Sequence, residues 1–152
     1  MKIAFLCDHP EHWETVADWM FDEFCAVDRP CVTRTMMLEK IKTRKRAFPY
    51  TFVALIGDVC VGTITLYDND LKGESATPWL GSLVVAPAWR GRGIARVLMA
   101  YLEGYARAHG YSALYLRTEH TAGYYERLGW RFVKETIDPV YDLPTRVYQK
   151  GV

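Results

Sequence analysis

Residues 83–96 have the sequence Leu83-Val84-Val85-Ala86-Pro87-Ala88-Trp89-Arg90-Gly91-Arg92-Gly93-Ile94-Ala95-Arg96. The apolar start, ended by a proline, predicts a strand, and the turn rich in Gly and Arg leads into the start of a helix. The first amides of a helix have no partner within it, and with the helix dipole they favour an anion. The glycines allow the backbone to approach such an anion closely, and the arginines add positive charge beside it. The stretch therefore predicts a phosphate or pyrophosphate site between a strand and a helix.

Two other phosphate-binding loops fit this stretch less well. The dinucleotide fingerprint needs a third glycine where Arg96 stands, and the ATP/GTP loop needs a Gly-Lys-Ser/Thr ending that is absent.

Strands and helices are also predicted on both sides of this stretch. The helical pattern runs from Ile94 to His109, and Gly110 ends it. The remaining predicted elements after it are a strand at 113–117, a short helix at 121–128, and strands at 130–134 and 146–150. Before it, the predicted elements are a strand at 2–7, a helix capped by Asp8 and ended at Arg29-Pro30, a helix from Thr33 to about Arg46, a hairpin of 51–56 and 59–67, and a strand at 79–85.

The resulting order is β-α-α-β-β-β-α-β-α-β-β. Because strands and helices alternate after an early hairpin, the sequence predicts an α/β fold with a central mixed sheet flanked by helices. The length of 152 residues fits a single domain over residues 1–152.

The composition limits the classes of protein. Half of the residues are hydrophobic, which is enough for a core and argues against a disordered chain, and the formal net charge of +1 gives no support for nucleic acid as a partner. No apolar run approaches the length of a membrane helix and no signal peptide is visible. The four cysteines show no paired metal-ligand spacing, so we expect reduced thiols, no metal site and a cytoplasmic location.

Two motifs resemble one family. Arg90-x-x-Gly93-x-Ala95, after the strand end Val85-Ala86-Pro87, resembles the acetyl-CoA motif of the GNAT superfamily of N-acetyltransferases. About thirty residues later, the segment 122–130 (Ala-Gly-Tyr-Tyr-Glu-Arg-Leu-Gly-Trp) is similar to the second signature helix of the same family. The order of elements also fits that family from end to end.

The resemblance implies acetyl-CoA as co-substrate and a role for each matched residue. The strand 83–85 is expected to splay from its neighbour and bind the pantetheine arm, with the N–H of Val85 at the thioester oxygen. The amides of 91–96 are expected to hold the pyrophosphate. Tyr125 is expected beside the sulfur, as the general acid. The implied acetyl-CoA contacts are Leu83, Val84, Val85, Arg90, Gly91, Arg92, Gly93, Ile94, Ala95, Arg96 and Tyr125.

A general base is expected because an amine must lose its proton to attack. Many members of the family carry a Glu on the strand before the phosphate loop, but residues 79–84 contain no acid. The nearest candidates are Asp68, Asp70, Glu74, Glu119 and His120. We take Glu119, which stands where many relatives have Asn, as the candidate base.

The acceptor is expected to be a primary amine of a small molecule or a peptide. The acidic loop from Asp68 to Glu74 would suit a cationic acceptor such as an aminoglycoside or polyamine, whereas the basic end of the second helix, 40–46, would suit an acidic peptide. The missing strand carboxylate leaves open an acetyl-CoA sensor with little turnover, and use of a longer acyl-CoA also stays open. The family also makes a homodimer an open possibility.

Overall fold

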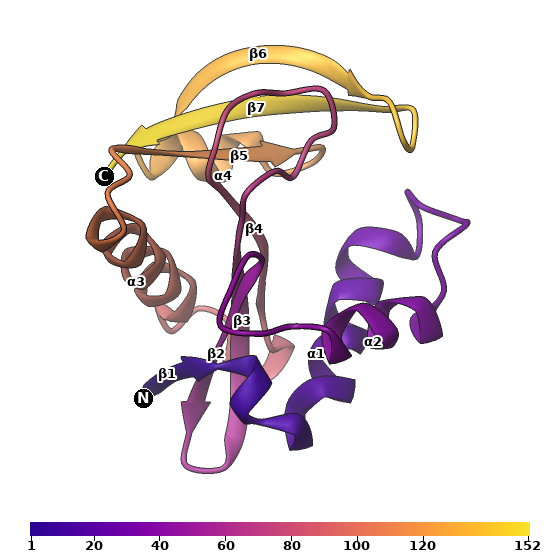
Figure 1. The fold of residues 1–152 in the computed structure, drawn as a ribbon, viewed down its shortest axis with the longest axis vertical. Coiled ribbons are helices and arrows are strands. Elements are labelled where there is room, and N and C mark those ends of the chain that lie inside the picture. Colours follow the sequence, from indigo (N-terminus) through magenta and orange to yellow (C-terminus); the bar gives the residue numbers. More distant parts are fainter.

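Seven strands form one mixed sheet, in the spatial order β1-β2-β3-β4-β5-β7-β6, in the computed structural model, which describes all residues 1–152 (Figure 1). The strands are β1 (Lys2–Phe5), β2 (Tyr50–Ile56), β3 (Val59–Tyr67), β4 (Trp79–Val85), β5 (Ala113–Thr118), β6 (Arg131–Asp138) and β7 (Leu143–Gly151). Only β4 and β5 pair in parallel; the other neighbours are antiparallel. The predicted α/β fold class with a mixed sheet is confirmed.

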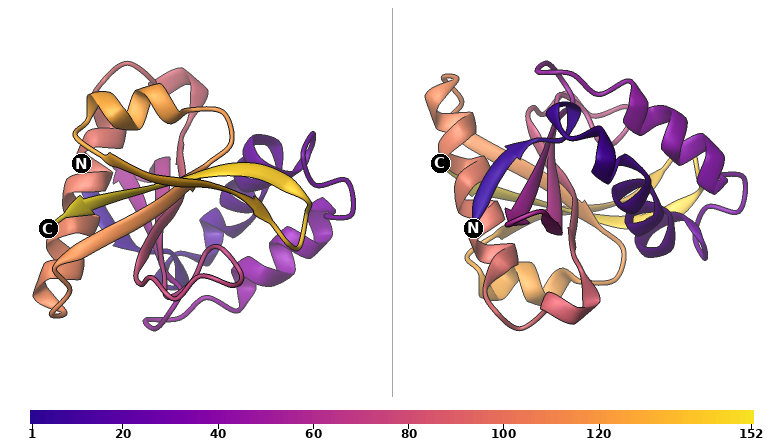
Figure 2. Two further views of the ribbon diagram at one scale, coloured as in Figure 1. Left: turned by 90° about the horizontal axis from the view of Figure 1, so that it is seen from above. Right: turned by 90° about the horizontal axis from the view of Figure 1, so that it is seen from below.

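Four α-helices cover the sheet, namely α1 (Trp13–Met20), α2 (Arg34–Lys42), α3 (Ile94–Ala108) and α4 (Ala122–Arg127). Their order among the strands is the predicted one. Helix α3 lies on one side of β2–β4, and α1 and α2 lie on the other, as Figures 1 and 2 show. None of the helices is both long and apolar enough to cross a membrane.

Strand β2 shows why this part of the sheet is buried on both faces. Phe52 and Ala54 belong to the core cluster that α3 completes, while Val53 and Leu55 belong to the cluster formed with α1 and α2. Successive side chains of a strand point to opposite faces, so a strand covered on both sides is apolar without alternation. The core thereby fixes the central strands between two helical layers.

The first helix begins later than predicted. Asp8 does not cap it: two 3-10 turns, Leu6–Asp8 and Pro10–His12, come first, and α1 starts at Trp13 without a side-chain cap. The Asp8 carboxylate instead pairs with the guanidinium of Arg46, 38 residues away. A long-range ion pair has taken the group that a local capping rule would use.

Helix α2 begins as predicted and ends earlier. The hydroxyl of Thr33 accepts the N–H of Met36 at 3.1 Å, which is the predicted N-cap. The helix ends at Lys42, not near Arg46, because the hydroxyl of Thr43 donates to the carbonyl of Lys40 at 2.7 Å and closes the last turn. The basic residues that follow therefore lie on a connecting loop.

Candidate active site

Strands β4 and β5 separate soon after they meet. Their only paired residues are Trp79 and Tyr115, where the N–H of Tyr115 donates to the carbonyl of Pro78 at 3.0 Å. A register shift against β3 follows, and Ser82 has a positive φ of 50°. An extra residue of this kind bends a strand and increases its twist. The edge of β4 that faces β5 is left without a strand partner beyond this point.

The N–H of Val85, predicted to hold the thioester oxygen, lies on that open edge. The N–H of Ala86 donates to the carbonyl of Val61 on β3 at 2.9 Å. Because alternate residues of an antiparallel strand bond to the same neighbour, Val84 and Ala86 face β3, and the amide and carbonyl of Val85 face the gap. The carbonyl of Val85 is engaged there by Nε of Arg90 at 3.1 Å.

The predicted phosphate loop has the geometry of a helix-terminus anion site. Gly91 and Gly93 have φ values of +76° and +80°, which favour glycine, and a Cβ added at either would meet no atom within 4 Å. Helix α3 begins directly after Gly93 without a side-chain cap. The first helical bond runs from the N–H of Val97 to Gly93, so the amides of residues 94–96 have no intrahelical partner.

The other predicted acetyl-CoA residues divide between the core and the surface. Val84 and Ile94 are buried in the core, and Ala95 packs against it, so their side chains hold the strand and the helix in place. Arg96 is exposed. The guanidinium of Arg92 stacks on the ring of Trp89, 4.6 Å from its centroid. For Val84 and Ile94, only the backbone is placed to contact a ligand.

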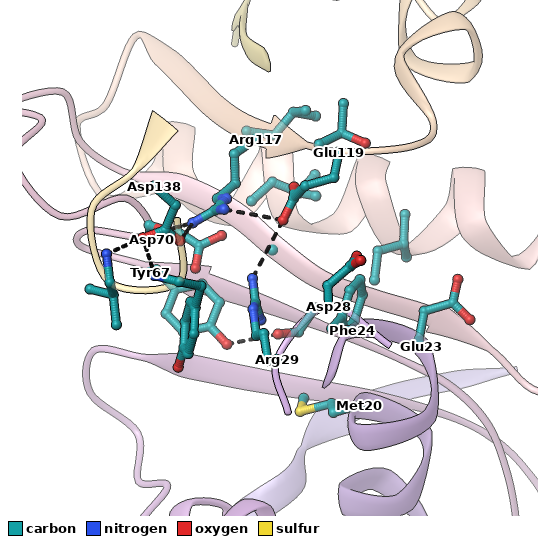
Figure 3. A pocket seen from close by; sticks show the side chains of 18 of the residues that line it. Met20, Glu23, Phe24, Asp28, Arg29, Tyr67, Asp70, Arg117, Glu119 and Asp138 are labelled. Carbon is teal, nitrogen blue, oxygen red and sulfur yellow. Dashed lines mark hydrogen bonds and ion pairs between the residues drawn. The ribbon is translucent and has the colours of Figure 1, made fainter. Parts of the chain in front are cut away.

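A cavity of about 550 Å³ lies beside the bulge of β4 (Figure 3). It is enclosed by α1 and α2 with their connecting segments, by the loop before β4, and by the ends of β5 and β6. Leu83, Glu119 and Tyr125 all line it, although they are far apart in the sequence. The tertiary structure thus brings a predicted strand residue, the predicted acid and the predicted base to one cavity. No three His, Cys, Asp or Glu side chains converge as a metal-binding group.

Tyr125 lies in the cavity wall on α4. Its ring packs edge-on against Tyr124 and Trp130, with centroids at 5.2 and 6.3 Å. Its hydroxyl has no hydrogen-bond partner within the protein. Burial raises the pKa of Tyr125 to about 12, with smaller contributions from Tyr124 and Glu23, so the phenol stays protonated at neutral pH and can act as a donor.

Glu119 lies in the wall of the same cavity, but arginines hold its carboxylate. The carboxylate accepts hydrogen bonds from Nη2 of Arg117 at 3.1 Å and from the hydroxyl of Thr145 at 3.3 Å. It also forms an ion pair with Arg29, whose Nη2 lies 3.6 Å from Oε1. Arg117 also donates to Asp138 at 2.5 Å (Figure 3). The oxygens of Glu119 are therefore already occupied by donors of the protein itself.

Asp138 completes this ion-pair network from the end of β6. Burial by itself would raise its pKa, but hydrogen bonds from Arg117 and from the N–H of Val140 outweigh that effect and hold the pKa below its usual range. The carboxylate is therefore ionised at neutral pH. It ties the end of β6 to β5 across the cavity wall.

Asp70 is a different kind of carboxylate in the same cavity. No side-chain or backbone donor of the protein lies within hydrogen-bond distance of its carboxylate oxygens. It lies against Gly81 of β4: a Cβ at Gly81 would be 2.9 Å from Oδ2 of Asp70. Burial raises the pKa of Asp70 to about 7, although Arg117 and Arg29 oppose the rise. The group can therefore both lose and accept a proton near neutral pH.

The sequence analysis placed Asp70 only among several loop acids. Its approach to Gly81 depends on how the loop before β4 folds back over the sheet, for which no local pattern exists. The one signal available was Gly81 itself, because a glycine inside a strand often marks a close approach of another group.

The model of the acetyltransferase (GNAT) family matches residues 8–130, which is more than half of the chain. The protein belongs to the GNAT acetyltransferase family. It is therefore an acyltransferase, as the two motifs predicted. The match covers both the phosphate loop and the α4 segment with Tyr125.

Solved structures show the same GNAT fold at low sequence identity. An aminoglycoside 6'-N-acetyltransferase in complex with coenzyme A has a TM-score of 0.79 and 20% identity, with 99% of this chain and 97% of that chain covered. The aminoglycoside 6'-N-acetyltransferase from Enterococcus faecium gives 0.73 and 19%, with the same coverage. A Salmonella typhimurium acetyltransferase with its cofactor acetyl-CoA gives 0.69 and 19%, covering 99% and 93%.

Proposed function

We propose that this GNAT protein transfers the acetyl group of acetyl-CoA directly to the nitrogen of a primary amine, with both substrates bound at once. The observation that carries the proposal is the open edge of β4, which connects the glycine loop at the start of α3 with the cavity that holds the Tyr125 hydroxyl. Two of the structures with this fold were solved with coenzyme A or acetyl-CoA, which supports the same donor here.

In this proposal the backbone and Tyr125 act on the thioester. The free amides of 94–96 bind the pyrophosphate, and the N–H of Val85 donates to the carbonyl oxygen as negative charge develops on it. The amine nitrogen then forms the C–N bond and the C–S bond breaks. Tyr125 gives its proton to the departing thiolate and regains one from the attacking nitrogen, which still carries one proton more than the amide product.

The amine proton needs an acceptor, and we assign it to Asp70 rather than to Glu119. Glu119 is held by Arg117 and Arg29, whereas the Asp70 carboxylate has no donor and a pKa near neutrality. Asp70 also lies beside Gly81, within the strand segment 79–84 that has no acid of its own. An ammonium substrate would bind to ionised Asp70 and transfer its proton there before attack.

Binding and turnover distinguish this proposal from an acetyl-CoA sensor. We expect acetyl-CoA at about 100 times its Kd to add about 2.7 kcal/mol of stability, equal to a rise in melting temperature of roughly 5–10 °C, with no rise for NAD. A panel of amines is then screened for acetylated product. No rise would contradict the donor assignment, and a rise without product from any amine would favour the sensor. A cytoplasmic location and a homodimer stay predictions.

A further inference from the structure

The acidic loop and the basic helix end, which predicted opposite kinds of acceptor, meet in one cavity. Asp70 comes from the loop before β4, and Lys40 and Arg44 come from the end of α2 and the residues after it. All three line the 550 Å³ cavity that also holds Tyr125. A cavity of this volume suits a small molecule. A single acceptor molecule bound in this cavity would therefore face both the acidic Asp70 and the basic Lys40 and Arg44.

The charges of this cavity are unequally neutralised. Its wall contains five carboxylates and five Lys or Arg side chains. Three of the five carboxylates, Glu23, Glu119 and Asp138, have an Arg within 4.0 Å, and a fourth, Asp28, bonds to the ring of His120. Of the five cations, only Arg29 and Arg117 have a carboxylate partner. Asp28 and Asp70 therefore have no Lys or Arg partner, against three unpaired cations, Lys40, Arg44 and Lys72, so the unpaired charge of the cavity is positive by one.

Arg44 is the most confined of these cations. It is half-buried, and its Nε is inaccessible to solvent and has no hydrogen-bond partner. Its guanidinium lies 5.7 Å from the centroid of the Tyr67 ring. Carboxylates and phosphates match the guanidinium fork. Arg44 lines the cavity and has no carboxylate within 4.0 Å, so an oxyanion of a ligand would give it the anionic partner that it lacks, at the Nη groups rather than at the covered Nε.

Tyr67 connects Arg44 with Asp70. Its hydroxyl forms a hydrogen bond with the hydroxyl of Ser82 at 2.7 Å, at the bulge of β4. A Cβ added at Gly81 would lie 2.8 Å from the edge of the Tyr67 ring and 2.9 Å from Oδ2 of Asp70, so the ring and the carboxylate both lie against Gly81. Arg44 and Asp70 therefore both approach the Tyr67 ring, yet they do not pair with each other. Each is free to take the opposite charge of a ligand.

Resting on the proposed function, we propose that the acceptor is a small amine that also carries an oxyanion, a carboxylate or a phosphate, with its amine at Asp70 and its oxyanion at Arg44. Lys40 and Lys72, which are exposed, add positive charge to the same wall. A polycation such as an aminoglycoside or a polyamine would place its additional ammonium groups against these three cations. The charge of the cavity therefore separates this acceptor from those of the aminoglycoside acetyltransferases that share the fold.

Matched acceptors test the proposal with acetyl-CoA held at saturation. The panel contains ω-amino acids from glycine to aminohexanoate with their carboxamides, lysine with cadaverine, phosphoethanolamine with ethanolamine, and the polycations spermidine and kanamycin. For at least one pair we expect the oxyanion member to have the higher kcat/KM, by about 10- to 100-fold, the range for hydrogen bonds between charged groups. The carboxylate and phosphate pairs show which oxyanion is preferred.

Two variants identify the residue responsible. Arg44→Gln is expected to bring the kcat/KM ratio within the preferred pair to about one while acetyl-CoA still raises the melting temperature. Lys45→Gln removes the same charge from the next residue, which is exposed and does not line the cavity, and should keep the ratio. Two results would overturn the inference about the oxyanion and leave the proposed acetyl transfer intact. One is an unchanged kcat/KM ratio in Arg44→Gln, and the other is turnover of cadaverine, spermidine or kanamycin that equals or exceeds that of the oxyanion-bearing amines. Acetyl-CoA binding without product from any amine would overturn both the inference and the proposed transfer.

Discussion

Replacing Asp70 with Asn is expected to stabilise the protein and to remove most of its activity. The substitution keeps the size of the side chain and removes only the charge. Asp70 lines the cavity beside Gly81, and its carboxylate has no hydrogen-bond donor, so ionising it in the folded protein costs free energy. The same uncompensated charge is what would make it a proton acceptor.

The size of the stability effect follows from the pKa. Burial raises the pKa of Asp70 from 3.8 to about 7 in the folded protein. Below about pH 4, Asp70 is protonated in both the folded and the unfolded state and does not change the free energy of unfolding. Between about pH 4 and 7 it is ionised in the unfolded chain but still protonated in the folded protein, so the free energy of unfolding falls as the pH rises. Above about pH 7 the group is ionised in both states and this loss of stability is complete. This difference corresponds to at most about 4 kcal/mol. For a chain of 152 residues, each kcal/mol changes the melting temperature by roughly 2–4 °C.

Activity and stability are measured on the same variants across pH. With the acceptor found above, kcat/KM of the wild type should rise about tenfold per pH unit up to about 7 and then level off, because ionised Asp70 accepts the proton of a bound ammonium. Asp70→Asn should be slower by about 100-fold or more at pH 7. Its rate should continue to rise above pH 7, since it depends on amine that is already neutral in solution.

The control is Asp68→Asn, an exposed acid of the same loop that does not line the cavity. It should keep the wild-type pH profile and melting temperature. If Asp70→Asn retained a rate within about twofold and levelled off at the same pH, Asp70 would not be the base. A lower melting temperature than wild type at pH 8 would show that the Asp70 charge is not buried at a cost.

Three further substitutions, one of them with a matched control, test other parts of the protein. Tyr125→Phe should lower kcat by about tenfold or more while the Kd for acetyl-CoA, measured by calorimetry, changes little; a rate within about twofold would exclude the donor role. Gly93→Val should weaken acetyl-CoA binding, because its φ of +80° strains a β-branched residue at the phosphate loop; Gly104→Ala, in open space inside α3, should instead add about 0.5–1 kcal/mol of stability and leave the Kd unchanged. Arg117→Gln should cost about 3–5 kcal/mol in denaturant unfolding at pH 7, since it leaves the buried Asp138 unpaired, and the loss should shrink below about pH 4 as that carboxylate is protonated. A loss that did not vary with pH would argue against that explanation.

The sequence by itself determined the order of the elements, the glycine loop before α3 and the segment around Tyr125. These are local features: apolar strands ended by proline, helical spacing, and a glycine where the backbone needs a positive φ. The family followed from two such motifs at their expected separation. The prediction of Asp8 as a helix cap was wrong because Arg46, distant in sequence, takes its carboxylate.

Only the tertiary structure decided what the cavity contains. Asp70, Arg44 and Glu119 come from three separate segments, and none of their sequence surroundings tells which carboxylate is paired and which is free. Arg117 and Arg29 converge on Glu119, whereas Asp70 reaches Gly81 without a donor. Ionisation and charge pairing depend on distances of a few ångströms between segments far apart in the chain, and folding alone sets those distances.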